Sequence, residues 1–205
     1  MRKLLNTLYI TNELCYLSKD RENIVITIDD KEVKKIQFSI DASLEVIENA
    51  IKEKVDMIIT HHPFIFKAIK SINEQDILSK KIRALIRNDI NIYSIHTNLD
   101  SSVSGLNDYV LEKLGYTDYK FLDYDEEKNC GIGRIFKLDE EKDLKKFIEE
   151  LKLKLQISNL RVISNDLNKK IKKVALINGS AMSYWRKAKQ EKIDLFITGD
   201  VGYHD

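Results

Sequence analysis

Asp56-Met57-Ile58-Ile59-Thr60-His61-His62-Pro63 joins a short apolar run to two adjacent histidines and the only proline of the chain. The run is too short for a helix and rich in isoleucine, which favours a buried strand. Pro63 disfavours a helical backbone at His62, so both histidines are expected directly at the strand end. Because ligands bind outside the carboxyl ends of strands in open α/β sheets, this pair is the first candidate for a functional site.

The four histidines of the chain, His61, His62, His96 and His204, each follow a short run of strand character. Side chains alternate along a strand, so His61 and His62 suit two neighbouring metals better than one shared metal. Together with Asp100 they predict a site for Zn, Fe, Mn or Co, since imidazole and carboxylate are the usual ligands of these metals. For any one histidine, a partly buried ring with an ordinary hydrogen bond is the alternative.

The composition is that of a globular chain with balanced charge. Its 205 residues suffice for one sizeable α/β core or for two small lobes. The 34 basic and 33 acidic residues leave a net charge of +1 without a block of like charge, so neither nucleic acid nor a membrane is an expected partner. Cys15 and Cys130 match no C-x-x-C pattern, and reduced thiols in a cytoplasmic protein are expected.

Hydrophobic periodicity predicts alternating strands and helices along most of the chain. A short amphipathic helix is expected up to about residue 20, and the strands at 24–28 and 36–40 can form a hairpin. A helix that Ser43 caps then leads into the strand at 57–59, which makes a β-α-β unit with parallel strands. The further strands are expected at 90–95 and 130–136, and the further helices at 76–88, from Ser104 to a stop at Gly115, and after a cap at Asp139.

A second β-α-β unit is predicted near the end of the chain. Lys34–Thr60 can be laid without a gap on Lys172–Thr198 at a constant offset of 138 residues, which places His61-His62 on Gly199-Asp200. Two copies of one unit are inferred, although any two such units share part of this pattern. The polar and aromatic stretch 116–129 is the expected boundary between a first lobe at 1–120 and a second at 121–205. A cleft between the strand ends of the two lobes would suit a site with two centres.

Four segments resemble the signatures of the Nif3-like family, also called GTP cyclohydrolase 1 type 2 homologues. The order and spacing of these segments match over nearly the whole chain. The resemblance implies an α/β fold of two related lobes, a dinuclear divalent-metal centre and a ring-shaped homohexamer. The segments are Ile59-Thr60-His61-His62-Pro63, Ser94-Ile95-His96-Thr97-Asn98-Leu99-Asp100, Gly131-Ile132-Gly133-Arg134, and Phe196-Ile197-Thr198-Gly199-Asp200 with Tyr203-His204.

Carried over to this chain, the resemblance gives the histidines distinct roles. It implies that His61 and His62 are ligands of different metals and that Asp100 is a third ligand. It makes His96 and His204 pocket residues, which could transfer protons in catalysis. The family completes its metal centre with a Gly-His segment and a Glu beyond the Tyr-His of the second lobe. This chain stops at Asp205, so either a C-terminal truncation is expected or the missing His and Glu come from elsewhere.

The predicted function is that of a metal-dependent hydrolase, in which a metal-bound water attacks a carbon or phosphorus centre. A nucleotide is the expected small-molecule substrate by resemblance alone, because no Gly-x-Gly-x-x-Gly or Walker segment is present. A non-catalytic metal- or ligand-binding scaffold that acts through partners is the alternative, and a plain structural domain is a third interpretation. Arg134 is expected either as a pocket cation or as a surface strand residue, whereas Asp41 and Asp200 could border the cleft.

Overall fold

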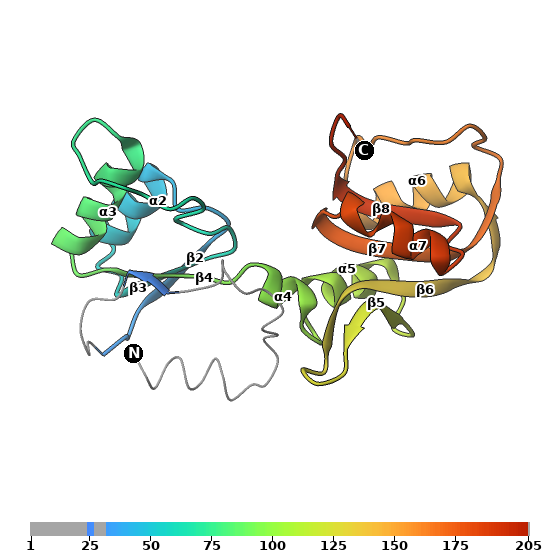
Figure 1. Cartoon of the computed structure of the whole chain (residues 1–205), viewed down its shortest axis with the longest axis horizontal. Coiled ribbons are helices and arrows are strands. Elements are labelled where there is room, and N and C mark those ends of the chain that lie inside the picture. Colours follow the sequence, from blue (N-terminus) through green and yellow to red (C-terminus); the bar gives the residue numbers. More distant parts are fainter. Residues whose placement is uncertain (1–23, 27–31, 205) are drawn as a thin grey trace. The chain divides into compact units, whose positions relative to one another are not determined.

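The computed structural model describes residues 24–26 and 32–204, and the expected N-terminal helix lies outside them. Contacts divide the chain into Met1–Leu99 and Asp100–Asp205, so the division falls inside the short helix α4 (Thr97–Ser101) and not near residue 120 (Figure 1). The helix that follows, α5 (Leu106–Leu114), packs its buried Leu111 and Leu114 into the core of the second unit. This packing explains why the division precedes α5.

The first unit contains a four-stranded sheet in the order β1-β4-β3-β2. The strands β2 (Ile36–Ser39), β3 (Met57–Thr60) and β4 (Asn91–Ser94) are parallel, and β1 (Ile24–Ile26) runs antiparallel to β4. The expected hairpin of the first two strands is therefore wrong. Each of these strands pairs instead with a strand later in the chain, so β1 and β2 form opposite edges of the sheet.

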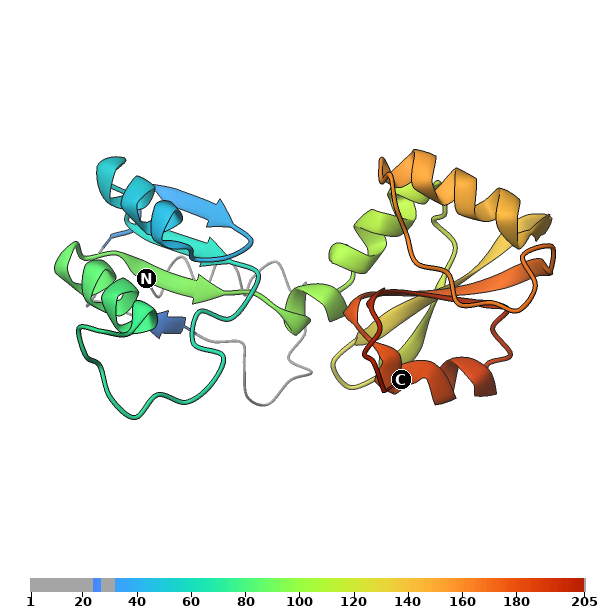
Figure 2. The same cartoon turned by 90° about the horizontal axis from the view of Figure 1, so that it is seen from above.

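Two helices cover one face of this sheet, as Figure 2 shows from above. In α2 (Leu44–Lys52) the side chain of Ser43 accepts a hydrogen bond from the Val46 amide, and in α3 (Ile77–Arg87) Asp76 accepts one from Ser79. Both are N-caps that satisfy otherwise unpaired amides of the first turn. Between helices and sheet lies a buried core of Ala42, Ile47, Ala50, Val55, Ile58, Leu85, Ile90 and Ile92.

The second unit contains a sheet in the order β5-β6-β7-β8, with helices on both faces (Figure 2). Its strands are β5 (Lys120–Asp125), β6 (Cys130–Asp143), β7 (Lys170–Ser180) and β8 (Leu195–Asp200), and only the β7–β8 pair is parallel. The helices α5 and α6 (Leu144–Leu155) pack on one face, and the turn η1 (Met182–Tyr184) with α7 (Trp185–Gln190) lies over the other.

The long strand β6 corrects one expectation about the second unit. A helix was expected after Asp139, but pairing of Lys142 and Asp143 with β7 prolongs the strand beyond a register shift, and α6 begins only at Leu144. Reduced thiols were also expected, whereas Cys130 in β6 is disulfide-bonded, and Cys15 lies outside the described residues. Within the described ranges, no helix has the length and apolar character needed to cross a membrane.

The two predicted β-α-β copies agree in register. Ile36 pairs with Met57 in the first copy, and Val174 pairs with Leu195 in the second, at the same offset of 138 residues. The loop before each final strand is also the same, since Lys54 and Lys192 both have φ of 53°.

Matching side-chain contacts extend this agreement. Asp56 Oδ2 accepts hydrogen bonds from the amides of Lys34 and Lys35 at 3.0 and 2.9 Å. In the second copy, Asp194 Oδ2 accepts from the amides of Lys172 and Lys173 at 2.9 and 2.8 Å. In each copy a lysine ammonium also contacts a glutamate in the loop before the final strand, through Lys35–Glu53 and Lys173–Glu191. The two units therefore contain one structural element twice.

Candidate metal centre

The histidine pair continues the ladder between β3 and β2 beyond the strand end. The His61 amide donates to the Ser39 carbonyl at 3.3 Å, and the His62 amide donates to the Ile40 carbonyl at 3.0 Å. The backbone is thus held beside β2 while the side chains leave the strand. The His61 ring is partly buried and the His62 ring is exposed.

His61 is held by a backbone carbonyl. Its Nδ1 atom lies 3.0 Å from the carbonyl oxygen of Ile95, which follows the neighbouring strand β4. A carbonyl oxygen can only accept a hydrogen bond, so we assign the proton to Nδ1. In the neutral ring this tautomer leaves the lone pair on Nε2, the atom that is then available to a metal.

His62 is held by a carboxylate. Its Nδ1 atom lies 2.8 Å from Oδ1 of Asp41, which follows the edge strand β2. The same argument places a proton on Nδ1 and, in the neutral ring, a lone pair on Nε2. The sequence singled out Asp41 only as a residue that could border a cleft. Its position two residues beyond a strand parallel to β3 was the signal that could have paired it with His62.

The third histidine of this unit lies beside the other two. The centroid of the His96 ring is 5.2 Å from that of His61 and 6.0 Å from that of His62, and the His61 and His62 centroids are 5.1 Å apart. His96 follows β4, which is parallel to β3, so the strand topology brings the three rings to one end of the sheet. This end of the first sheet is called the histidine cluster below.

Two buried hydroxyl groups brace the backbone under the histidine cluster. The oxygens of Thr60 and Ser94 lie 2.9 Å apart on adjacent strands, and Thr60 also donates to the His62 carbonyl at 2.9 Å. The Ser94 hydroxyl accepts from the amide of Phe64 at 3.2 Å. The chain on both sides of the histidine pair is thereby tied to the end of the sheet.

Asp100 and His204 belong to the second unit. The side-chain atom Oδ1 of Asp100 is buried. The main-chain carbonyl of Asp100 accepts a hydrogen bond from the side chain of Asn107 at 2.8 Å. The next residue, Ser101, has a buried hydroxyl with no partner within the described part of the chain. His204 is exposed, and its ring packs edge-on against Tyr203 at 4.9 Å. The roles predicted for Asp100 and His204 stay predictions.

The donors of the histidine cluster fit a divalent metal in kind. Metal-bound histidines usually donate their second ring N–H to a carbonyl or a carboxylate, and His61 and His62 contact one of each. Over residues 24–26 and 32–204, no three His, Cys, Asp or Glu side chains are grouped as the ligands of one ion. The cluster therefore supplies oriented imidazoles and needs additional ligands to complete a coordination shell.

Arg134 departs from both roles that the sequence allowed. Its side chain is 0% exposed and forms an ion pair with Asp108, so Arg134 is neither a pocket cation nor a surface residue. Tyr119 donates to the same carboxylate at 2.6 Å, and burial together with this hydrogen bond raises the pKa of Tyr119. Asp200 is exposed at the end of β8, at the position that corresponds to His62.

Comparison with known proteins gives close matches over nearly the whole chain. A GTP cyclohydrolase 1 type 2 homolog of Clostridium acetobutylicum is 38% identical over 192 residues, which are 92% of this chain and 71% of that relative. The homolog of the same name from Clostridium perfringens is 39% identical over 191 residues, with 92% and 72% covered.

Solved structures share the fold. Reduced HcgD from Methanocaldococcus jannaschii has a TM-score of 0.76 at 30% identity, with 98% of this chain and 79% of that chain covered. A Bacillus cereus protein related to NIF3 has a TM-score of 0.86 at 22% identity, with 98% and 83% covered, and supports the fold alone. The model of the family described as Duf34/NIF3 (NGG1p interacting factor 3) matches residues 9–205. The chain therefore belongs to the Duf34/NIF3 family.

Proposed function

We propose that the chain binds divalent metal ions through His61 and His62 and acts as a metal-dependent hydrolase. One observation carries the metal part of the proposal: both Nδ1 atoms face oxygen acceptors, at 3.0 and 2.8 Å. This arrangement orients the two imidazoles before any metal binds, because each ring is fixed by a hydrogen bond on its far side. In the proposal Nε2 of each ring is the coordinating atom.

We propose two metals, one for each ring of the histidine pair. The His61 and His62 rings are inclined at 51° to one another, and each is fixed by a contact on a different neighbouring segment. Separate contacts of this kind favour one metal for each ring. The third ligand in the proposal is Asp100, whose carboxylate would suit Zn, Fe, Mn or Co.

In the hydrolase proposal, divalent metals held by His61 and His62 would supply an activated water and would polarise a substrate oxygen. His96 lies next to both candidate ligands and would be placed to take up the proton of such a water. Asp41 keeps the His62 ring in one orientation. A purine nucleotide is the proposed substrate class, since the closely related proteins are named GTP cyclohydrolase 1 type 2 homologs. The ring-shaped homohexamer and the cytoplasmic location stay predictions.

Turnover by the metal-loaded full chain tests the hydrolase proposal. The protein is loaded with Zn, Mn or Fe and incubated with GTP and with a panel of phosphoesters. We expect product formation that His62→Ala removes and that Glu48→Ala, an exposed change on α2, leaves intact. A wild-type chain that holds metal but leaves GTP and every phosphoester unchanged at high enzyme concentration would contradict the proposal.

A non-catalytic scaffold is the second candidate, and one observation favours it. Phe38 on the edge strand β2 and Ile40 directly after it are 74% and 66% exposed, and the Ile40 carbonyl accepts the hydrogen bond from the His62 amide. Exposed apolar side chains along a sheet edge are typical of a surface that pairs with another chain. A partner that His62→Ala retains and Phe38→Ser releases would support the scaffold, and turnover by the isolated chain would count against it.

A further inference from the structure

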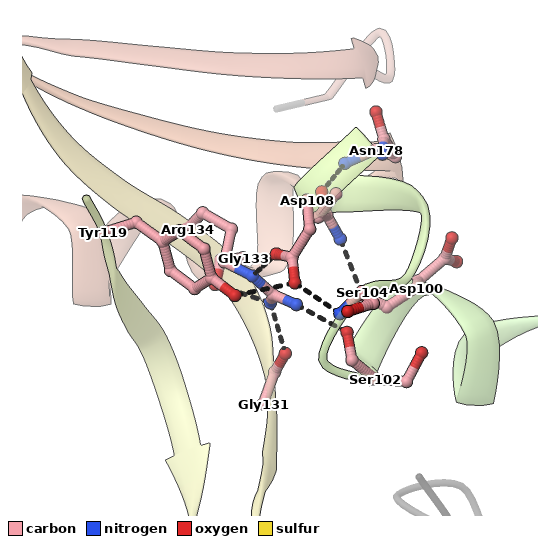
Figure 3. A network of polar contacts seen from close by, with 10 residues as sticks. Asp100, Ser102, Ser104, Asp108, Tyr119, Gly131, Gly133, Arg134 and Asn178 are labelled. Atoms are coloured by element: carbon pink, nitrogen blue, oxygen red, sulfur yellow. Dashed lines mark hydrogen bonds and ion pairs between the residues drawn. The ribbon is translucent and has the colours of Figure 1, made fainter. Parts of the chain in front are cut away.

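The segment that begins with Asp100 is held at alternate residues by side chains of the second unit. Figure 3 shows these contacts, which involve the main chain of Asp100, Ser102 and Ser104. The Asp100 carbonyl accepts from Asn107 at 2.8 Å, and the Ser102 carbonyl accepts from Arg134 at 2.7 Å. The Ser104 amide donates to Asp108 at 2.7 Å. The contacts define one path for the backbone that carries Asp100.

Arg134 and Asp108 contact this segment and also pair with each other. Besides Ser102, the Arg134 guanidinium donates to the carbonyls of Gly131 and Gly133 at 2.8 and 3.2 Å and pairs with Asp108. It also lies 4.2 Å from the centroid of the Phe121 ring. Planar guanidinium groups with several fixed acceptors have little freedom to reorient. The Arg134 guanidinium is therefore held in one orientation by contacts on several sides.

The two glycines explain how an arginine fits here. A Cβ atom at Gly131 would lie 2.4 Å from the Asp123 carbonyl oxygen, and one at Gly133 would lie 2.7 Å from Ile177. Gly133 also has φ of 70°, which other residues rarely adopt. Gly131-Ile132-Gly133-Arg134 thus combines close strand packing with carbonyls turned toward the guanidinium.

Asn107 connects this region directly to Asp100. It is fully buried, and its side-chain amide is used at both ends. Nδ2 donates to the Asp100 carbonyl at 2.8 Å, and Oδ1 accepts from the Asn178 amide in β7 at 2.9 Å. The main chain of Asp100 is thereby tied to the second sheet through one side chain.

We propose that Asn107 is a positioning residue that orients Asp100 for metal binding by fixing its main chain to β7. This inference rests on the proposed role of Asp100 as a ligand. Asn107 does not itself contact the metal in this proposal. Fixing the main chain before binding means that less conformational freedom is lost when the carboxylate coordinates, and this raises the affinity.

Asn107→Asp separates positioning from packing. The aspartate has nearly the same shape and can still accept from the Asn178 amide, but as a carboxylate it cannot donate to the Asp100 carbonyl. The added negative charge alone would strengthen cation binding, so a weaker affinity cannot be attributed to charge. Asn107→Ala, which removes both contacts, is the second variant. Leu111→Val, a buried change on the same helix outside the polar contacts, is the matched control.

The experiment is a titration of the full chain with Co²⁺, followed by visible absorption, at a temperature where Trp185 fluorescence reports every variant folded. We expect Asn107→Asp and Asn107→Ala to weaken Co²⁺ about 10- to 100-fold and to change the absorption bands, because the ligand geometry changes. Leu111→Val should keep the wild-type affinity and bands.

The outcomes separate the inference from the proposed function. If wild type itself does not bind Co²⁺, the metal-binding proposal fails, and the inference fails with it. If wild type binds and both Asn107 variants keep its affinity and bands, only the inference is overturned. It is also overturned if Leu111→Val weakens binding by the same factor, since the effect would then follow from packing.

Discussion

The two β-α-β copies share their backbone and differ at the end of the final strand. Asp56 and Asp194 accept the same pair of amide hydrogen bonds in the two copies. At the equivalent positions the first copy has His61-His62, just beyond β3, and the second has Gly199-Asp200, which still belong to β8. The shared contacts stabilise the fold of each copy, whereas the side chains at these end positions differ. The same element therefore presents two histidines in one unit and a glycine and an aspartate in the other.

The largest effect on stability is expected for the ion pair between Asp108 and Arg134 in the second unit. Asp108→Ala would leave the fully buried Arg134 without its carboxylate in the second unit, which should destabilise that unit by about 3 to 5 kcal/mol. The only tryptophan, Trp185, lies in that unit, so its fluorescence during urea denaturation reports the loss. Hydrogen exchange of the β3 amides should stay unchanged. Equal losses in both units would show that the two units do not respond independently.

The shared aspartates give the next largest effect. Asp56→Ala and Asp194→Ala each remove a carboxylate that accepts two amide hydrogen bonds, and each should cost about 1.5 to 3 kcal/mol. Asp194→Ala should lower the urea midpoint seen by Trp185, and Asp56→Ala should lower the protection of β3 amides. If only one of the two variants lost stability, the aspartates of the two loops would not make equivalent contributions.

The N-cap of α2 is present in only one of the two copies, and its removal should have a smaller effect on stability. Ser43 caps α2, but the corresponding residue of the second copy is Ala181, and α7 has no side-chain cap. Ser43→Ala should therefore destabilise the first unit by about 1 kcal/mol, measured by exchange of the α2 amides. Ser43→Asp, which keeps an acceptor, serves as the control and should retain protection. An unchanged Ser43→Ala protein would mean that the cap contributes nothing to α2.

The paired glutamates give the smallest effect. The Lys35 ammonium lowers the pKa of Glu53, whereas the ammonium groups of Lys120 and Lys173 together lower the pKa of Glu191. A lowered pKa in the folded state gives a contribution to stability that is present above the unfolded pKa and is lost as the pH falls through the folded value. Carboxyl NMR titration should show that Lys35→Ala restores the Glu53 pKa toward its ordinary value.

The second copy provides the comparison for that titration. Lys120→Ala should raise the pKa of Glu191 only in part, because Lys173 still contacts this carboxylate at 3.2 Å. Complete restoration by Lys120→Ala would mean that the Lys173 contact does not act on the Glu191 carboxylate in solution.

Local sequence patterns predicted much of the fold, because hydrophobic periodicity and capping residues act over a few neighbouring positions. The helix that ends at Gly115 and the strand before His61 lie where the pattern placed them. Strand pairing was less predictable. The segment at 24–28 could pair with a near neighbour or a distant strand, and the alternating pattern is the same in both cases.

Of the candidate site, the sequence predicted the histidines but not the groups that hold their rings. Adjacent histidines at a strand end are visible in the sequence, but the acceptors behind them depend on which strands lie beside β3. Asp41 became a partner of His62 because β2 is parallel to β3. Arg134 was misjudged because its burial depends on two glycines that admit close strand packing, an effect that residue type alone does not reveal.

The most direct test of the account is ¹⁵N NMR of the imidazole nitrogens while the full chain is titrated with Zn²⁺. We expect the Nε2 resonances of His61 and His62 to shift on metal binding, whereas both Nδ1 atoms stay protonated toward Ile95 and Asp41. Unchanged Nε2 resonances, or metal bound through Nδ1, would contradict metal binding through the Nε2 atoms of His61 and His62.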